Sequence, residues 1–376
     1  MKAPTVLAAL VVSCLAIAAT SSLHAEKRHV YFGTGGPGAK GIYRSTFDTE
    51  TGKLTAAELA DEIGAPGFLA LHPDGTKLYA VANFTGGPGA VGYSIGRDGA
   101  LQRITSAPTG DGGAAHIAVH PSGRFLLTAQ YGGGSVALFP LDAAGKLGTA
   151  KVTEHEGGTR VVARRQDAPH PHWCGFSPDG KFALVPDLGL DGIVIYRVNA
   201  EAPAIERHGF AASERGGGAR HMRFSPDGKF IYLLNELTSS VTTFTWDAAK
   251  GEARNIGTMP GLTAEQQRRE SINAAAEILV HPTGRFVYSS NRGHDSVTVF
   301  RADPAKGALR VVQVQPVRGA FPRNIAFSPD ATWLLAAGAD SNTVSVHKVN
   351  PETGELTYQR GAVINVPAPI CILFAP

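Results

Sequence analysis

Residues 222–228 read Met222-Arg-Phe-Ser-Pro-Asp-Gly228, and the same pattern recurs five more times along the chain. Each copy has a short apolar run, then His-Pro or Ser-Pro, and a turn that leads into a second apolar run. In Pro-Asp-Gly, Pro presets φ at the first turn position and Gly tolerates a positive φ. Each copy therefore predicts a strand, a tight turn and a second strand.

The prolines of the six copies give the period of the repeat. They are Pro73, Pro121, Pro178, Pro226, Pro282 and Pro329, separated by 47 to 57 residues. This period is typical of a propeller blade of four short antiparallel strands. The two longest intervals contain insertions, an Arg-rich segment at 154–169 and a segment at 263–275 that is typical of a short helix.

The two ends of the chain complete the count of blades. Residues 27–65 supply three strands, over 29–34, 41–48 and 53–60, but no innermost strand. Residues 370–376 match the innermost-strand pattern, with Pro376 lying 47 residues after Pro329. We expect an all-β, seven-bladed β-propeller in which the C-terminal strand completes blade 1 and closes the ring. An open β-sandwich or two domains would not explain a truncated first repeat matched by an orphan last strand.

The first 25 residues differ in kind from the rest. Lys2 opens a basic start, residues 6–19 are almost wholly apolar, and residues 21–25 are mostly small. This pattern is typical of a secretory signal peptide, and its apolar run is too short for a bilayer-spanning helix. We expect residues 1–25 to be removed and residues 26–376 to form one propeller domain, in the periplasm or outside the cell.

The composition excludes several classes of partner. With 35 Lys and Arg against 32 Asp and Glu, the chain has no strong field to attract nucleic acid or an anionic membrane. We expect no nucleic-acid partner, no membrane span and a monomer. Cys174 and Cys371 fall on innermost strands of blades that are not neighbours, so we expect free buried thiols rather than a disulfide.

Equivalent positions of the repeats indicate which face carries chemistry. In a four-stranded antiparallel blade, the loop before the innermost strand and the loop between the second and third strands lie on one face. The Pro-Asp-Gly turns lie on the other face, so we interpret His72, His120 and His281 of the His-Pro turns as structural. Positions six and five before each proline, and nine and ten after it, ring the mouth of the central channel.

Each of these four positions, followed from blade to blade, is called a column below. The residues within a column differ in chemical type, whereas packing alone would keep them similar. Arg220, Arg292 and Arg323 would converge at the mouth, where guanidinium groups suit a carboxylate or phosphate. The remaining candidates are polar residues of the same columns, His172, His221, Glu236, Glu277, Asn291 and Gln130. They predict an asymmetric polar pocket with groups able to transfer protons. The alternative is that the mouth of a propeller is wet and simply tolerates polar side chains.

Two segments, Ala219–Glu236 and Ala276–Asp295, carry a resemblance to a known family. From about residue 28 to its end, the chain resembles the seven-bladed propeller lactonases, which include bacterial 6-phosphogluconolactonases and fungal carboxymuconate cyclases. The resemblance implies an active site of His172, Arg220, Glu236 and Arg292. It also implies a hydrolase that opens the lactone ring of an anionic sugar or organic acid. The predicted signal peptide is a departure from this family pattern, because an enzyme of sugar-phosphate metabolism would be expected in the cytoplasm.

For such a reaction, the expected catalytic residues are His172 or Glu236 as general base and Arg220 as the group that polarises the carbonyl. Arg292 would clamp the anionic substituent. The other expected substrate-binding residues are Arg323, Glu277, His221, Asn291 and Gln130. Glu236 could instead form a structural ion pair with Arg220 or Arg292.

Other chemistries lack a complete motif. Gly33-Thr-Gly-Gly-Pro-Gly38 has dinucleotide-binding spacing, but a β-rich segment follows it instead of a helix. His170 and His172 have no clear third metal ligand. We expect no metal and no cofactor. Two other functions stay open, a non-enzymatic envelope propeller that binds a ligand or protein at the same mouth, and a lactone-forming cyclase.

Overall fold

The Ser-Pro-Asp-Gly copies form the hairpins that the sequence predicts. In one of them, Ser225 Oγ accepts a hydrogen bond from the Phe230 N–H at 2.9 Å and donates to Asp227 Oδ1 at 2.6 Å. Gly228 has a φ of +70°, which a residue with a Cβ rarely adopts. The turn joins β17 (Ala219–Phe224) to β18 (Phe230–Asn235) as an antiparallel pair.

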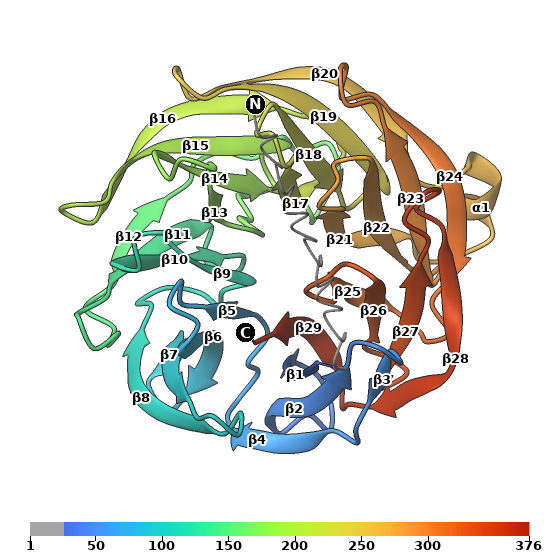
Figure 1. Cartoon of the computed structure of the whole chain (residues 1–376). Coiled ribbons are helices and arrows are strands. Elements are labelled where there is room, and N and C mark those ends of the chain that lie inside the picture. The colour runs from blue at the N-terminus through green and yellow to red at the C-terminus, as the bar shows by residue number, and fades with distance from the viewer. Residues whose placement is uncertain (1–25, 376) are drawn as a thin grey trace, which may run out of the picture.

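The computed structural model describes residues 26–375, whose strands form seven antiparallel sheets arranged as a ring (Figure 1). Blades 2 to 4 consist of β5 (Leu69–Leu71), β6 (Lys77–Phe84), β7 (Gly87–Ile95) and β8 (Leu101–Pro108); β9 (His116–Val119), β10 (Phe125–Gln130), β11 (Ser135–Pro140) and β12 (Lys151–Glu154); and β13 (Gly175–Phe176), β14 (Phe182–Asp187), β15 (Gly192–Asn199) and β16 (Ala204–Ala212).

Blades 5 to 7 repeat this order. They consist of β17, β18, β19 (Ser240–Asp247) and β20 (Glu252–Pro260); β21 (Ala274–Val280), β22 (Phe286–Arg292), β23 (Ser296–Ala302) and β24 (Leu309–Pro316); and β25 (Pro322–Phe327), β26 (Trp333–Gly338), β27 (Thr343–Val349) and β28 (Leu356–Asn365). In each blade the first strand lies nearest the channel (Figure 1).

Blade 1 joins the two ends of the chain, which confirms the predicted closure. Its innermost strand is β29 (Pro369–Phe374), which pairs antiparallel with β1 (Lys27–Thr34) from Val30 opposite Phe374 to Thr34 opposite Pro369. The outer strands are β2 (Gly41–Asp48), β3 (Lys53–Leu54) and β4 (Glu58–Glu62), the last two both pairing with β2. The predicted signal peptide, residues 1–25, and Pro376 lie outside the described residues.

Apolar side chains of neighbouring blades pack face to face, and polar contacts tie one blade to the next. Tyr31 and Tyr79 each donate a hydroxyl hydrogen bond of 2.7 Å to a glycine carbonyl in the following blade. His72 and His120, from the His-Pro turns, donate to Gly123 O at 3.1 Å and Gly180 O at 3.0 Å. These histidines are structural, as expected, and Cys174 and Cys371 are free and buried.

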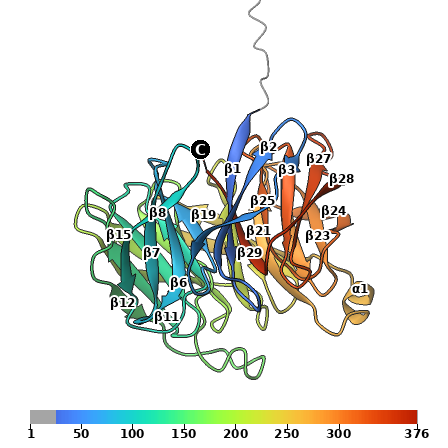
Figure 2. The ribbon, with the colours of Figure 1, turned by 90° about the horizontal axis from the view of Figure 1, so that it is seen from below.

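The insertion at 263–275 contains the single helix of residues 26–375, α1 (Ala264–Arg268), which extends from the rim of the ring (Figure 2). Thr263 and Gln266 form its capping box. No helix in the described part of the chain is long and apolar enough to cross a membrane. The Arg-rich insertion at 154–169, called the insertion loop below, leaves β12 and crosses to the mouth of the channel without forming a further strand.

Candidate functional site

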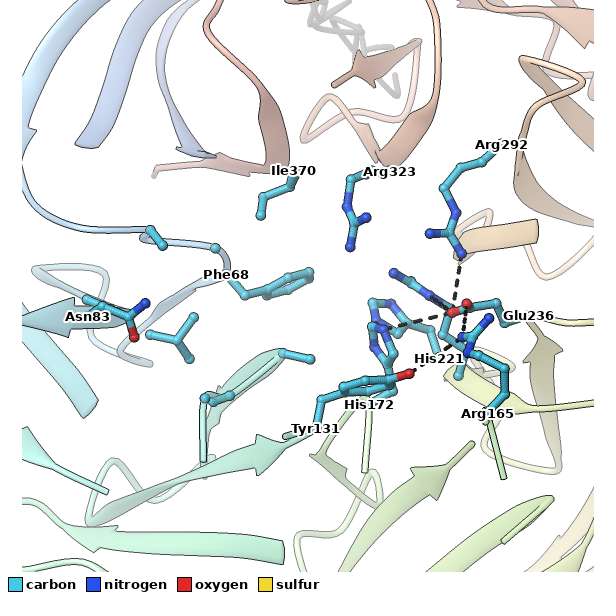
Figure 3. Close-up of a pocket in the computed structure, with 18 residues that line it drawn as sticks. Phe68, Asn83, Tyr131, Arg165, His172, His221, Glu236, Arg292, Arg323 and Ile370 are labelled. Carbon is cyan, nitrogen blue, oxygen red and sulfur yellow. Dashed lines mark hydrogen bonds and ion pairs between the residues drawn. The ribbon is translucent and has the colours of Figure 1, made fainter. Parts of the chain in front are cut away.

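A cavity of about 580 Å³ opens at the mouth of the channel (Figure 3). None of the Pro-Asp-Gly turn residues lines it. Its volume is in the range of small-molecule sites. The lining residues come from all seven blades and the insertion loop: Ala65, Gly67, Phe68, Val81, Ala82, Asn83, Gly113, Ala114, Ala115, Tyr131, Arg165, His172, Arg220, His221, Glu236, Arg292, Arg323 and Ile370.

The cavity has a charged half and an apolar half. Blades 4 to 7 and the insertion loop supply the charged side chains, whereas blades 1 to 3 supply mainly small or apolar ones. In Figure 3, Phe68 and Ile370 lie across the cavity from Glu236. A bound molecule would therefore meet a polar wall on one side and an apolar wall on the other.

Glu236 is the centre of the charged half. Its Oε2 accepts from Arg220 Nε at 2.8 Å and lies 3.2 Å from Arg292 Nη2, and its Oε1 accepts from Arg165 Nη2 at 2.6 Å. Burial alone would raise the pKa of this carboxyl, but Arg292 and Arg220 lower it well below its ordinary value. Glu236 is therefore ionised at neutral pH and is a weak base.

Arg220 is held in place by several contacts, one of them to Glu236. Besides Glu236, it donates through Nη1 to the carbonyl of Ala276, and its side chain is only 3% exposed. Burial, followed by repulsion from Arg292, lowers its pKa to about 9. Arg220 is thus still a cation at neutral pH, and its Nη2 makes no hydrogen bond to any residue within 26–375.

His172 borders the cavity with its Nε2 4.0 Å from Glu236 Oε2, which is too long for a hydrogen bond. Burial, Arg220 and His221 together lower its pKa well below the ordinary value of histidine. The ring of Tyr131 packs edge-on against it, with centroids 5.3 Å apart. His172 is therefore a neutral imidazole at neutral pH, able to accept a proton.

Arg323 reaches the cavity from the start of blade 7 and points toward the same space as Arg292 (Figure 3). It has no ion pair and no hydrogen bond with another residue of the described chain. Burial, then repulsion from Arg292, lowers its pKa. The cavity lining thus holds four guanidinium groups against the one carboxylate of Glu236, a net charge of three positive units when the histidines are neutral.

Because of the strand pleat, the two columns before each proline lie at different depths relative to the cavity. Successive side chains of a strand point to opposite sides. The column six before each proline lines the cavity with His172, Arg220, Arg323 and Ile370. The column five before lies below it, where Glu277 is fully buried and accepts from His221 Nδ1 at 3.1 Å. Phe68 and His221 belong to this second column and still reach the cavity, whereas Glu277 does not line it.

The same pleat places Asn291 and Gln130, two predicted substrate contacts, outside the cavity lining. Both are fully buried at the end of the second strand of their blades. Asn291 Nδ2 donates to Ser296 Oγ at 3.0 Å and Thr298 Oγ1 at 2.9 Å, so it stabilises its own blade. The next residue along the chain, Tyr131 or Arg292, turns toward the cavity instead.

Arg165 is a site residue that the columns miss, because it belongs to the insertion loop. The loop is held by buried contacts, including His155 Nδ1 to Asp187 Oδ2 at 2.6 Å and Gln166 Nε2 to Leu188 O at 2.9 Å. Asp191 also binds the loop through Gln166. The Arg-rich composition of the loop was the one sequence signal for this contribution.

Comparisons with known proteins agree with the fold and identify a family. The chain matches the family model "Lactonase, 7-bladed beta-propeller" over residues 29–374. It is 31% identical to the 6-phosphogluconolactonase of Bacillus subtilis strain 168, over 90% of this chain and 95% of that protein. It is also 31% identical to the 6-phosphogluconolactonase of Formosa agariphila, over 84% of this chain and 90% of that protein.

A solved structure of a similar protein has the same fold. The periplasmic gluconolactonase PpgL of Pseudomonas aeruginosa superposes with a TM-score of 0.85 and 29% sequence identity, covering 93% of this chain and 99% of that chain.

Proposed function

The chain belongs to the family of seven-bladed β-propeller lactonases, and we propose that the lactone it hydrolyses is that of an anionic sugar or organic acid. It is a lactone hydrolase, as its relatives named 6-phosphogluconolactonase and gluconolactonase indicate. The observation that carries the substrate proposal is the cavity charge, four arginines against one glutamate.

We assign the general base to His172 rather than to Glu236. A base must be unprotonated and must have a lone pair free to take a proton from the attacking water. Both carboxylate oxygens of Glu236 already contact guanidinium groups, Oε2 those of Arg220 and Arg292 and Oε1 that of Arg165. His172 Nε2, in contrast, has no hydrogen-bond partner among the described residues. His172 is neutral for the reasons given above, and it borders the cavity where a water molecule would meet the substrate.

In the proposed reaction, His172 takes a proton from water as the water oxygen bonds to the carbonyl carbon of the lactone. The acyl C–O bond of the ring then breaks, and the proton passes from the imidazolium to the departing ring oxygen. The product is an open-chain hydroxy acid. Arg220 stabilises the negative charge that develops on the carbonyl oxygen, and Glu236 keeps Arg220 and Arg292 in place.

The anionic substituent of the substrate would bind to Arg323 and Arg292. Arg323 has no acidic partner of its own among residues 26–375, and a phosphate or carboxylate would supply one. Arg292 already contacts Glu236 at 3.2 Å and stacks over the Phe321 ring at 5.3 Å, so its guanidinium is oriented before substrate arrives.

We further propose that the chain is exported and acts as a monomer in the periplasm or outside the cell, without a nucleic-acid partner. The composition of residues 1–25 supports export, and so does the similarity to a periplasmic gluconolactonase. Light scattering of the purified protein and fractionation of the producing cells test these two points.

The experiment that tests the function measures hydrolysis of a panel of sugar and aromatic lactones by wild type, His172→Gln and Arg220→Met. We expect wild-type turnover well above the uncatalysed rate, and a loss of about 10²- to 10⁴-fold in kcat for His172→Gln. Equal rates in all three proteins, at the level without enzyme, would remove the proposal. Formation of a lactone from an unsaturated dicarboxylate would instead indicate a cyclase.

A further inference from the structure

Beneath the cavity, three side chains form a continuous line of contacts that ends at the proposed base. Glu277 Oε1 lies 3.1 Å from His221 Nδ1, and His221 Nε2 lies 3.2 Å from His172 Nδ1. Glu277 is fully buried, and His221 and His172 are nearly so. We propose that Glu277 is a positioning residue that acts through His221 to leave the Nε2 atom of His172 unprotonated. This inference rests on the proposed hydrolysis for its catalytic meaning.

The first step is the charge state of Glu277. Its carboxyl oxygens face donors on every side, since Arg223 Nη2 donates to Oε1 at 3.0 Å and Asn324 Nδ2 donates to Oε2 at 2.7 Å. The Ile278 N–H also donates to Oε1 at 3.0 Å. A carboxylate can accept from all of these groups, whereas a carboxylic acid would turn a proton toward a donor. Glu277 is therefore an acceptor only.

The second step assigns the proton positions on the rings of His221 and His172. Because Glu277 only accepts, His221 must carry its proton on Nδ1. Burial, together with Arg220 and Arg223, lowers the pKa of His221 well below the ordinary value, so the ring has no second proton. Its Nε2 is then an acceptor, and the neighbouring Nδ1 of His172 must donate to it.

The third step is the consequence at the cavity. With its single proton on Nδ1, neutral His172 presents the lone pair of Nε2 toward Glu236 Oε2, 4.0 Å away, and the space that a water would occupy. The opposite tautomer would present an N–H group there and could not take a proton from water. The buried carboxylate thus determines which nitrogen of His172 is the base.

Neighbouring residues hold Glu277 and His221 in place. Asn324 also accepts from the Ile372 N–H at 3.0 Å, so the closing strand β29 supports the orientation of Glu277. The rings of Phe68 and His116 lie 5.8 Å and 5.5 Å from that of His221. The charged and titratable groups that face the two histidines are Arg220, Arg223, Arg292, Arg323, Glu236, Glu277, His116 and Tyr131.

The direct test uses the wild-type protein with ¹⁵N-labelled histidine and reads the ring-nitrogen shifts of His172 by NMR, assigned with His172→Gln. We expect a protonated Nδ1 and an unprotonated Nε2. A protonated Nε2 on neutral His172 would overturn the inference, whether or not the protein hydrolyses lactones. A protein with the expected tautomer and no turnover would overturn the proposed function instead.

The kinetic test compares Glu277→Gln, His221→Phe and the double variant, with Glu214→Gln as the control. Glu214 contacts Thr238 and Ser240 and no histidine. We expect Glu277→Gln to lower kcat by about 10²-fold while KM changes less than about threefold. The acid limb of its pH profile should move down by roughly one unit, because an opposite charge near the base is lost.

The double variant separates a positioning role from a structural one. If Glu277 acts through His221, adding Glu277→Gln to His221→Phe causes little further loss of kcat. Losses that multiply, or a Glu277→Gln enzyme with wild-type kcat and an unmoved acid limb, would contradict the proposal. Glu214→Gln should keep wild-type values throughout.

Discussion

At the scale of single residues, the charged half of the cavity depends on Glu236. Three guanidinium groups, those of Arg165, Arg220 and Arg292, lie within 2.6 to 3.2 Å of its carboxylate oxygens. Removing one partner of a buried ion pair costs far more than the net value of the pair, because the other charges stay buried without compensation. Glu236 therefore stabilises the fold as well as ordering the site.

Glu236→Gln should lower the free energy of unfolding by about 3 to 5 kcal/mol at pH 7, as urea denaturation would measure. Inorganic phosphate should restore part of this loss, since an anion in the cavity replaces the missing charge. The control is Glu265→Gln on α1, whose carboxylate pairs with Arg269 on the exposed surface and should change stability by less than about 1 kcal/mol. An unchanged unfolding curve for Glu236→Gln would contradict this account.

At the scale of elements, two structural features place the site residues, namely strand alternation and the insertion loop. Alternation along the chain turns Tyr131 and Arg292 toward the cavity and their neighbours Gln130 and Asn291 into the blade. The insertion loop adds Arg165 from outside the repeat. Asp191 links this loop to blade 5, because it accepts from Gln166 Nε2 and Thr159 Oγ1 on the loop and from the N–H groups of Gly216 and Gly218.

Asp191→Asn should lower the free energy of unfolding by about 1 to 3 kcal/mol, because the amide nitrogen would face N–H donors without an acceptor. KM should rise as well, since Arg165 and the start of blade 5 lose a shared anchor. Asn tolerates the φ of 53° at this position, so backbone strain does not enter. Asp167→Asn in the same loop, where the side chain is exposed, should leave both values unchanged. Equal behaviour of the two variants would show that Asp191 is not an anchor.

These two features explain which site residues could be predicted from the sequence. Repeat spacing predicts the columns, so His172, Arg220, Glu236, Arg292 and Arg323 could be placed at one mouth. Asn291 and Gln130 are expected at the mouth together with the residues that follow them, because repeat spacing alone does not tell which of two adjacent positions turns toward the cavity. Arg165 has no repeat equivalent, because a 16-residue loop carries no periodicity from which its course could be read.

At the scale of the whole molecule, closure of the ring by β29 supports both stability and the site. Ile372 lies in the apolar cluster between blades 1 and 7 with Val30 and Phe32. Ile370, two residues earlier, lines the cavity. The pairing of β29 with β1 could be predicted because the last seven residues repeat the innermost-strand pattern.

Ile372→Ala should lower the free energy of unfolding by about 2 to 5 kcal/mol, the usual cost of a large cavity in a core. Ile364→Ala is the control, since Ile364 packs against the same cluster from the outer strand β28 and is only partly buried. Its cost should be about 1 kcal/mol, in proportion to the smaller buried area. A larger loss for the outer residue would contradict the importance of the closing strand.

Stability should fall as the pH is lowered from 7.5 to 5.5. Burial lowers the pKa of His116, His172 and His221 in the fold, so the unfolded chain binds more protons below about pH 6.5. Each such histidine adds a slope of about 1.4 kcal/mol per pH unit between its folded and unfolded pKa values. Urea unfolding at several pH values measures the slope, and His116→Phe should reduce it. A flat profile would contradict neutral histidines in the site.

The central claim is that the arginines of the cavity select an anionic lactone. Its most direct test is kcat/KM for 6-phosphogluconolactone and for unphosphorylated gluconolactone, with wild type, Arg323→Met and the exposed Arg310→Met as control. We predict that wild type and Arg310→Met prefer the phosphorylated lactone by about tenfold or more, a difference of about 1.4 kcal/mol, and that Arg323→Met loses this preference. Equal kcat/KM for the two lactones in wild type, unchanged in Arg323→Met, would contradict the claim.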